Sequence, residues 1–127
     1  MHKYSLQLNP KNSVKVTGRA VRISQKNAVI LCDQLRGKSL KKGKTFLKNL
    51  VDQKESLKGR YYTNTAKELL NLLSSGESNA EFKGLDIERL IIHASASKSF
   101  TFYRPRSFKS GRTRRKMANV QVVLQER

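Results

Sequence analysis

Acidic side chains are absent from the last third of the chain, where no Asp or Glu lies between Glu88 and Glu126. The same stretch carries nine cations, which are Arg89, Lys98, Arg104, Arg106, Lys109, Arg112, Arg114, Arg115 and Lys116. A folded surface normally mixes both signs of charge, because like charges held close together repel one another. A basic segment without internal counterions therefore indicates a polyanionic partner, and RNA or DNA is the expected one.

Cysteine and long apolar runs are also scarce. The single Cys32 cannot form an internal disulfide, and its apolar helical pattern predicts a buried, inert thiol rather than a reactive one. No run reaches the roughly 18 apolar residues of a membrane-spanning helix, and the first ten residues lack the apolar centre of a signal peptide. His2 and His93 have no Cys or carboxylate at ligand spacing, so we expect no metal and no other cofactor.

The chain as a whole is strongly basic. Its 127 residues hold 27 Lys and Arg against 9 Asp and Glu, which gives a formal net charge of +18. This length supports one domain with a modest core. We expect a loosely held arm at residues 1–13, a strand and three helices at 14–86, and a long β-hairpin with the C-terminus at 87–127. The predicted fold class is α+β, with three helices packed on a short antiparallel sheet and a protruding basic hairpin.

Apolar residues alternate with a period of two at residues 14–23 and then recur with the period of a helix. Val14, Val16, Val21 and Ile23 predict a strand with either a bulge or a close backbone approach at Gly18. Three short helices are predicted, with the apolar stripes Ala28, Leu31, Cys32 and Leu35; Phe46, Leu47, Leu50 and Val51; Ala66, Leu69, Leu70, Leu73 and Ala80. Their expected N-terminal caps are Ser24, Ser39 and a capping box of Thr65 with Glu68, and the expected glycines at helix ends are Gly37 and Gly84.

The period returns to two after Gly84. Two strands of a hairpin are predicted from Leu90, Ile92, Ala94 and Ala96 and from Val120, Val122 and Leu124. Turn residues lie between them at 104–112. A first arm of about 16 residues would be about 50 Å long, whereas a globule of this chain has a radius of gyration of about 14 Å. The hairpin should therefore extend beyond the body of the protein.

Candidate nucleic-acid contacts fall in three groups. Cations alternate with aromatic rings near the hairpin tip, where arginine can bind phosphate and rings can stack on bases; a solvated basic loop is the alternative. Arg19, Arg22 and Lys26 could bind phosphate or simply line a solvated strand edge. Lys41, Lys42 and Lys44 lie on one face of the second helix, and we favour RNA contact for them too. The Gly43–Thr45 sequence lacks the first glycine of a phosphate-binding loop, so we reject that motif.

The chain resembles the universal large-subunit ribosomal protein called L-twenty-two in the bacterial scheme and L-seventeen in eukaryotic naming. The matching blocks, which run from about residue 14 to 126, are GRAVRIS, LRGKSL, ESNAEFKGLDIERL, RPR with GRTRR, and VQVVL. The ESNAEFKGLD block is similar to the archaeal and eukaryotic branch. Two departures concern lengths: residues 53–63 form a shorter segment than in typical archaeal and eukaryotic members, and Ser107 and Phe108 add to the bacterial tip pattern.

The resemblance implies a non-enzymatic constituent of the large ribosomal subunit in the cytoplasm, in contact with rRNA and neighbouring ribosomal proteins. Its hairpin tip, at Arg106, Ser107, Phe108 and Lys109, would line the nascent-peptide exit tunnel. The positions expected to bind rRNA are Arg19, Arg22, Lys26, Lys41, Lys42, Lys44, Lys98, Arg104, Arg106, Lys109, Arg112, Arg114, Arg115 and Lys116. No membrane and no small-molecule substrate is implied.

Three other functions stay open at this point. A free-standing basic protein that coats DNA or RNA would have the same charge. An RNA-modifying or RNA-cleaving enzyme would need a catalytic set, and the chain offers only His93 and the Asp86 and Glu88 pair. A membrane-surface peptide would need an apolar helix face, but the helix faces found here are required for the core.

Overall fold

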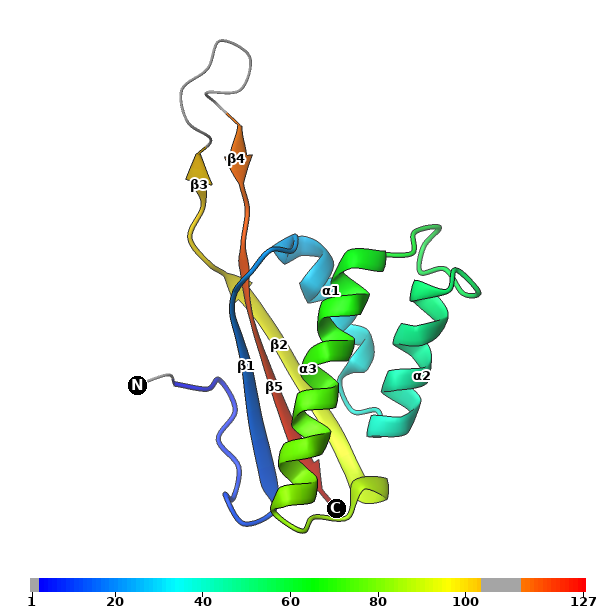
Figure 1. Ribbon diagram of the computed structural model, residues 1–127, viewed down its shortest axis with the longest axis vertical. Coiled ribbons are helices and arrows are strands. Elements are labelled where there is room, and N and C mark those ends of the chain that lie inside the picture. The colour runs from blue at the N-terminus through cyan, green and yellow to red at the C-terminus, as the bar shows by residue number, and fades with distance from the viewer. Residues whose placement is uncertain (1–2, 104–112) are drawn as a thin grey trace.

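A three-stranded antiparallel sheet forms the centre of the protein. The computed structural model describes residues 3–103 and 113–127. The sheet order is β1 (Ser13–Val21), β5 (Ala118–Glu126) and β2 (Leu90–Lys98), so the last strand of the chain lies in the middle. A short 3₁₀ helix, η1 (Ile87–Arg89), leads into β2. Beyond the sheet, β3 (Phe102–Tyr103) and β4 (Arg114–Arg115) pair as a narrow two-stranded ribbon (Figure 1).

Three helices cover one face of this sheet. They are α1 (Gln25–Leu35), α2 (Leu40–Val51) and α3 (Thr63–Phe82). The helix α3 packs on β1 and β5, α1 packs on β2, and α2 packs mainly on α3 (Figure 1). The predicted α+β fold, with helices on an antiparallel sheet, is confirmed.

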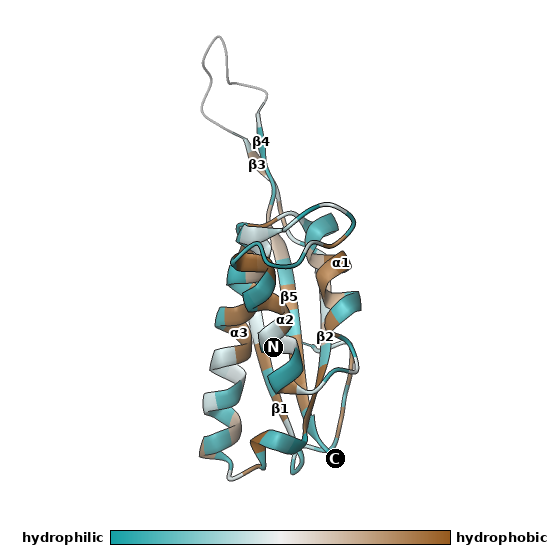
Figure 2. Cartoon of the chain, turned by 90° about the vertical axis from the view of Figure 1, so that its right-hand side faces the viewer, coloured by the Kyte–Doolittle hydropathy of each residue, from teal (hydrophilic) through white to brown (hydrophobic). Residues whose placement is uncertain are grey.

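The core lies between the helices and the sheet, and the hydropathy colouring of Figure 2 shows hydrophobic residues in both layers. Alternate residues of β5 are fully buried there, and Leu124 pairs with Val14 on one side and Ile92 on the other. The predicted helical stripes supply the other half, with Leu31, Leu35, Leu47, Leu50, Leu69 and Leu73 all fully buried. Burial of this apolar surface is the main force that holds the layers together.

Two helical glycines allow the helices to approach the sheet closely. A Cβ atom on Gly43 of α2 would lie 2.4 Å from Cδ1 of Ile92, and one on Gly76 of α3 would lie 2.8 Å from Cδ1 of Leu124. Gly43 is therefore a packing residue inside a helix. The rejection of a phosphate-binding loop at Gly43–Thr45 is confirmed.

The two edges of the sheet differ. At β2, Gly37 N donates to Ile92 O at 2.9 Å and Ile92 N donates to Lys38 O at 2.9 Å. Arg36 adds two bonds, from Nε and Nη2 to Ala94 O, both at 3.2 Å. The connection between α1 and α2 thus seals this edge. At β1, within the part of the chain that the structure describes, β5 is the only strand neighbour.

The N-terminal arm is more firmly held than the sequence indicates. Gln121 Oε1 of β5 accepts a hydrogen bond from Ser5 N at 3.1 Å, and Gln121 Nε2 donates to Lys3 O at 3.0 Å. The side chain of Ser5 bonds to that of Ser95 on β2. Hydrogen bonds of Lys3 and Ser5 thus hold the described start of the arm against the sheet, which the prediction of a loosely held arm did not include.

The start of α3 also differs from the prediction. The helix begins at Thr63 after Tyr62, whose φ of 46° is in the left-handed region, and Thr65 is a buried residue inside the first turn. The capping box of Thr65 and Glu68 is therefore wrong, and the helix is long, with 20 residues. Ser24 and Ser39 do occupy N-cap positions, although their side chains make no capping hydrogen bond.

The hairpin is interrupted between its base and its outer part. Pairing of β2 with β5 ends at Lys98 and Ala118, and β3 resumes only at Phe102. A single backbone bond, Ser99 N to Met117 O at 3.2 Å, spans the gap. The first arm consequently contains two strands instead of one continuous strand of about 16 residues. Figure 1 shows that β3 and β4 extend beyond the helices.

Candidate nucleic-acid interface

Two pairs of arginine and aromatic side chains lie on the β3–β4 ribbon. Phe102 pairs in register with Arg115 and Tyr103 with Arg114, and the guanidinium carbons lie 6.0 and 5.8 Å from the ring centroids. Because successive residues of a strand point to opposite faces, each face of the ribbon carries one such pair. Both faces therefore offer a planar ring beside a positive charge, which suits RNA bases and phosphates.

A cleft at the base of the ribbon brings body and hairpin residues together. Lys26 comes from the first turn of α1, Lys98 from the end of β2, Arg114 from β4, and Lys116 from the segment before β5. All four side chains are exposed, and they line a volume of about 270 Å³. No carboxylate is among the lining residues that the structure describes. Four cations around one hollow form a strongly positive site for phosphate groups.

The N-terminus of α1 forms one wall of this cleft. Ser24 and Gln25 line it, and the side chain of Ser24 does not cap the helix. The first amides of a helix lack intrahelical acceptors and carry partial positive charge. Anions commonly bind at helix N-termini for this reason. The first amides of α1 therefore favour an anion in the cleft together with the four cationic side chains.

A β-bulge places the other body cations near the same end of the sheet. The register of β1 against β5 shifts between Gly18 and Val21, as the sequence predicted, and Ala20 adopts a φ of 51°. Asn119 Oδ1 holds this bulge by accepting a hydrogen bond from Ala20 N at 2.9 Å. Ala118 pairs with Val21 on one side and with Lys98 on the other. The segment with the exposed Arg19 and Arg22 therefore lies level with the hairpin base.

The lysines of α2 lie elsewhere. Lys41, Lys42 and Lys44 line a separate hollow of about 650 Å³ between α2, α3 and η1, together with Glu77 and Glu88. Lys44 forms an ion pair with Glu77 of α3. This hollow is near the end of the sheet where β2 begins, opposite the hairpin. The structure thus separates the α2 lysines from the cleft, and one of them has an internal carboxylate partner.

The remaining predicted positions are those of the hairpin tip. Arg104, Arg106, Ser107, Phe108, Lys109 and Arg112 lie outside the described residues. The expected roles of these residues therefore stay predictions.

The side chains that could carry other chemistry are occupied in the fold. Burial raises the pKa of the Cys32 thiol from 9.0 to about 12, so the residue stays a neutral thiol. His93 Nε2 bonds to Gln125 Oε1 at 3.1 Å on the sheet. Among residues 3–103 and 113–127, no group of three potential metal ligands comes together. Over the same ranges, no helix has the length and apolar character needed to cross a membrane.

Sequence reasoning missed two cations that act inside the fold. Arg36 seals the edge of β2, and Lys83 Nζ donates to the carbonyl oxygens of Ser13 and Pro10 at 3.1 and 3.3 Å. Both side chains bind backbone oxygens, and such contacts cannot be predicted from the residue types along the chain. The only hint in the sequence was the position of Lys83 directly after the last residue of α3, because cations are favourable at the C-terminal ends of helices.

The sequence also matches a known protein family. Residues 16–125 match the family described as Ribosomal protein L22p/L17e. The chain belongs to this family. The match covers the bulge, all three helices and all but the last residue of the two long hairpin strands, so the L22p/L17e assignment includes every residue that lines the cleft.

Similar members of the L22p/L17e family come from archaea and are named large ribosomal subunit protein uL22. The protein from Methanococcus maripaludis is 33% identical over 147 aligned positions, with 98% of this chain and 96% of its own length covered. The protein from Methanocaldococcus jannaschii is 32% identical, with 98% and 94% covered, and that from Thermofilum pendens is 35% identical, with 84% and 83% covered. The first alignment is longer than the chain, so that relative has residues that this chain lacks.

Proposed function

We propose that this protein is a structural, non-enzymatic constituent of the large ribosomal subunit in the cytoplasm, where it binds and organises rRNA beside neighbouring ribosomal proteins. Membership of the L22p/L17e family and the archaeal relatives named as large-subunit proteins support this function. The cleft at the hairpin base is the observation that best supports the location of the rRNA-binding surface. There, cations from α1, β2, β4 and the segment before β5 converge without a carboxylate.

The cleft would hold rRNA by fixing phosphates from more than one side. Lys26 sits on the body, while Lys98, Arg114 and Lys116 belong to the hairpin, so a phosphate between them contacts both parts of the protein. Arginine can bind phosphate with two parallel bonds, and the lysines act as point charges. Binding would therefore fix the direction of the hairpin relative to the body as well as the position of the RNA.

The ribbon would extend this contact away from the body. Phe102 and Tyr103 offer ring surface on opposite faces, each beside an arginine. RNA bases stack on such rings with little dependence on sequence. The ribbon therefore suits insertion between RNA segments, with contacts on both faces.

We place the hairpin tip, at Arg106, Ser107, Phe108 and Lys109, beside the nascent peptide in the exit tunnel. This part of the proposal rests on the resemblance of the tip motif to the family pattern and on the way β3 and β4 extend beyond the helices (Figure 1). Arg104 and Arg112 flank the tip and would contact rRNA, as would Arg19, Arg22, Lys41 and Lys42 on the body. Lys44 has its carboxylate partner in Glu77, so we expect a smaller RNA contribution from it.

Sedimentation of tagged protein from its native cells tests this function. Near-stoichiometric comigration with large subunits that resists high salt supports it, because many contacts to one folded RNA must break together. Protein that spreads over bulk nucleic acid and is released by moderate salt contradicts it. That result would favour a free-standing nucleic-acid-binding protein, whose attraction to phosphate is mostly electrostatic and falls steeply with salt.

A further inference from the structure

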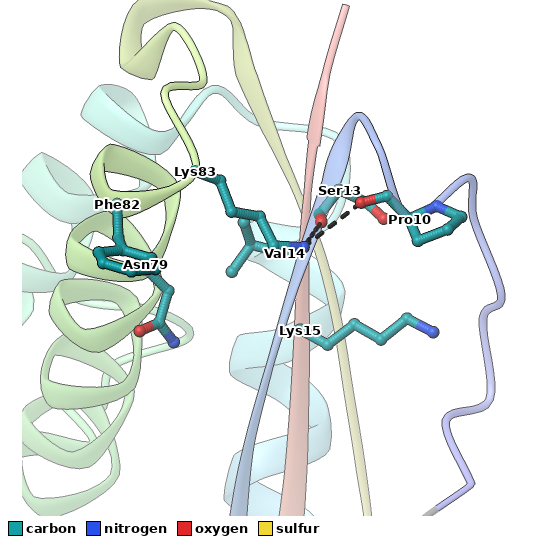
Figure 3. A pocket seen from close by; sticks show the side chains of 7 residues that line it. All are labelled: Pro10, Ser13, Val14, Lys15, Asn79, Phe82 and Lys83. Carbon is teal, nitrogen blue, oxygen red and sulfur yellow. Dashed lines mark hydrogen bonds between the residues drawn. The ribbon is translucent and has the colours of Figure 1, made fainter.

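A third hollow lies at the end of the sheet opposite the hairpin, between the N-terminal arm, β1 and the end of α3 (Figure 3). It has a volume of about 360 Å³, and its lining includes Pro10, Val14, Lys15, Asn79, Phe82 and Lys83. Val14 pairs with Leu124 near the far end of β5, whereas the hairpin base begins at Ala118. This hollow is therefore separate from the proposed rRNA cleft.

Phe82 is the most unusual residue of this hollow. Its side chain is 94% exposed, more than any other large apolar side chain that the structure describes. It follows the last buried position of α3, Ala80, and takes no part in the core. A fully exposed ring beside a hollow whose wall includes the buried Val14 is typical of a contact surface, because aromatic anchors supply much of the energy of protein interfaces.

The charge of the hollow indicates what complements it. Lys15 and Lys83 are its only charged lining residues, and no carboxylate lines it within the described part of the chain. Lys83 Nζ is held by the carbonyl oxygens of Ser13 and Pro10, as the dashed lines of Figure 3 show. Those oxygens fix the ammonium group in place but carry no net charge, so a carboxylate from a partner would still gain from pairing with it.

Other features of the hollow favour protein over RNA. The cleft at the hairpin base offers four exposed cations, whereas this hollow offers two that already have neighbours, since Lys15 Nζ also lies 5.2 Å from the ring centroid of Tyr4. The lining includes exposed apolar surface from Pro10 and Phe82. In addition, the hollow flanks β1, the edge strand with β5 as its one described strand neighbour, and a strand edge can bind an extended peptide.

We propose that this hollow is the docking site for an extended segment of a neighbouring ribosomal protein. The segment places an apolar side chain against Phe82 and Pro10 and a carboxylate near Lys83 and Lys15. This inference rests on the proposed function, because it takes the partner from the large subunit. It adds the surface used, the anchor residue and the chemistry of the partner segment.

Site-specific photo-crosslinking in assembled subunits tests this docking site. Phe82 is replaced by the photoreactive analogue p-benzoylphenylalanine in the tagged full-length chain, and purified large subunits are irradiated. Because the ring lies outside the core, the replacement leaves the fold intact. The matched control places the same analogue at Tyr61, an aromatic residue that is 40% exposed in the loop before α3 and outside the hollow.

We expect a crosslink from position 82, but not from position 61, to one ribosomal protein, at a segment with an apolar residue next to Asp or Glu. A crosslink to rRNA, or no crosslink in subunits that contain the chain, would overturn the docking proposal and leave the ribosomal function standing. A chain that never enters large subunits would instead refute the ribosomal function, and the docking site with it.

A pair of alanine variants gives a second measurement. Phe82→Ala should still enter large subunits, while the amount of the crosslinked neighbour that survives a high-salt wash falls roughly tenfold, as expected for loss of an anchor residue. Tyr61→Ala should leave that amount unchanged. Equal retention in both variants, measured by quantitative mass spectrometry of the washed subunits, would contradict the role of Phe82.

Discussion

Replacing Lys26, Lys98 and Lys116 with glutamine would remove three of the four charges of the hairpin-base cleft. All three side chains are exposed and lie at the surface of the cleft, so the substitutions should not disturb the core. None of them forms an ion pair within residues 3–103 and 113–127. Any loss of RNA binding would therefore report on the contacts themselves and not on folding.

The size of the effect follows from counterion release. If duplex RNA behaves like duplex DNA, each phosphate contact contributes about 0.9 to the slope of log K against log salt concentration. Relative to 1 M salt, one contact is then worth about 0.7 log units of affinity at about 0.15 M salt. Three contacts give about 2 log units, so the affinity for the protein's own large-subunit rRNA should fall about 100-fold. The slope itself should become less steep by about 2.7. Filter binding over a salt titration measures both quantities.

A control variant with the same loss of charge separates the cleft from the general basicity of the chain. Lys54, Lys58 and Arg60 are exposed in the loop between α2 and α3 and do not line the cleft. Replacing them with glutamine also removes three positive charges, but it should change the affinity less than tenfold. If both triple variants lose affinity equally, the cleft has no special role and the reasoning from its geometry fails.

Three further predictions concern Cys32, the Lys44 pair and the hairpin tip. Because the folded protein keeps the Cys32 thiol protonated up to about pH 12, whereas the unfolded chain loses that proton near pH 9.0, the free energy of unfolding should fall as pH rises from 9 to 12. Denaturant titration of the native protein and of Cys32→Ala should show a steeper decline for the native protein, and parallel curves would refute the burial argument. The pair of Lys44 with Glu77 joins α2 to α3, so a double-mutant cycle with Lys44→Met and Glu77→Gln should give a coupling energy of about 1 kcal/mol, and zero coupling would show that the pair does not stabilise the fold. Substitution of Phe108 or Lys109 by alanine should leave assembly intact and alter translation of stalling-prone peptides in a cell-free system; loss of assembly would show that the tip anchors the protein.

The helices and strands of the body could be predicted because each has a clear apolar period. The apolar stripe of α1, which ends at Leu35, and the alternating apolar residues of β5, which end at Leu124, each form the buried face of their element. Apolar residue types at these spacings identify such a face in the sequence. The start of α3 could not be predicted in this way. Tyr62 adopts a left-handed conformation that aromatic residues rarely take, so the chain enters the helix two residues before Thr65 without the expected cap.

The cleft could be predicted only as a set of residues. Charge identified Lys26, Lys98, Arg114 and Lys116, but their convergence depends on the pairing of Ala118 with Val21 and Lys98. That pairing determines which hairpin residues lie beside the start of α1. It depends on the register between strands far apart in the sequence, and a shift of one residue would change it. Charge alone likewise grouped Lys44 with the RNA contacts and did not reveal its pairing with Glu77.

The most direct test of the proposed function is a high-resolution cryo-electron microscopy map of the large subunit from the native cells. We expect an RNA phosphate in the cleft, within hydrogen-bonding distance of at least two of Lys26, Lys98, Arg114 and Lys116. We also expect RNA on both faces of the β3–β4 ribbon. A cleft that faces solvent, or that is filled by another protein, would contradict the assignment of the cleft as the rRNA-binding site.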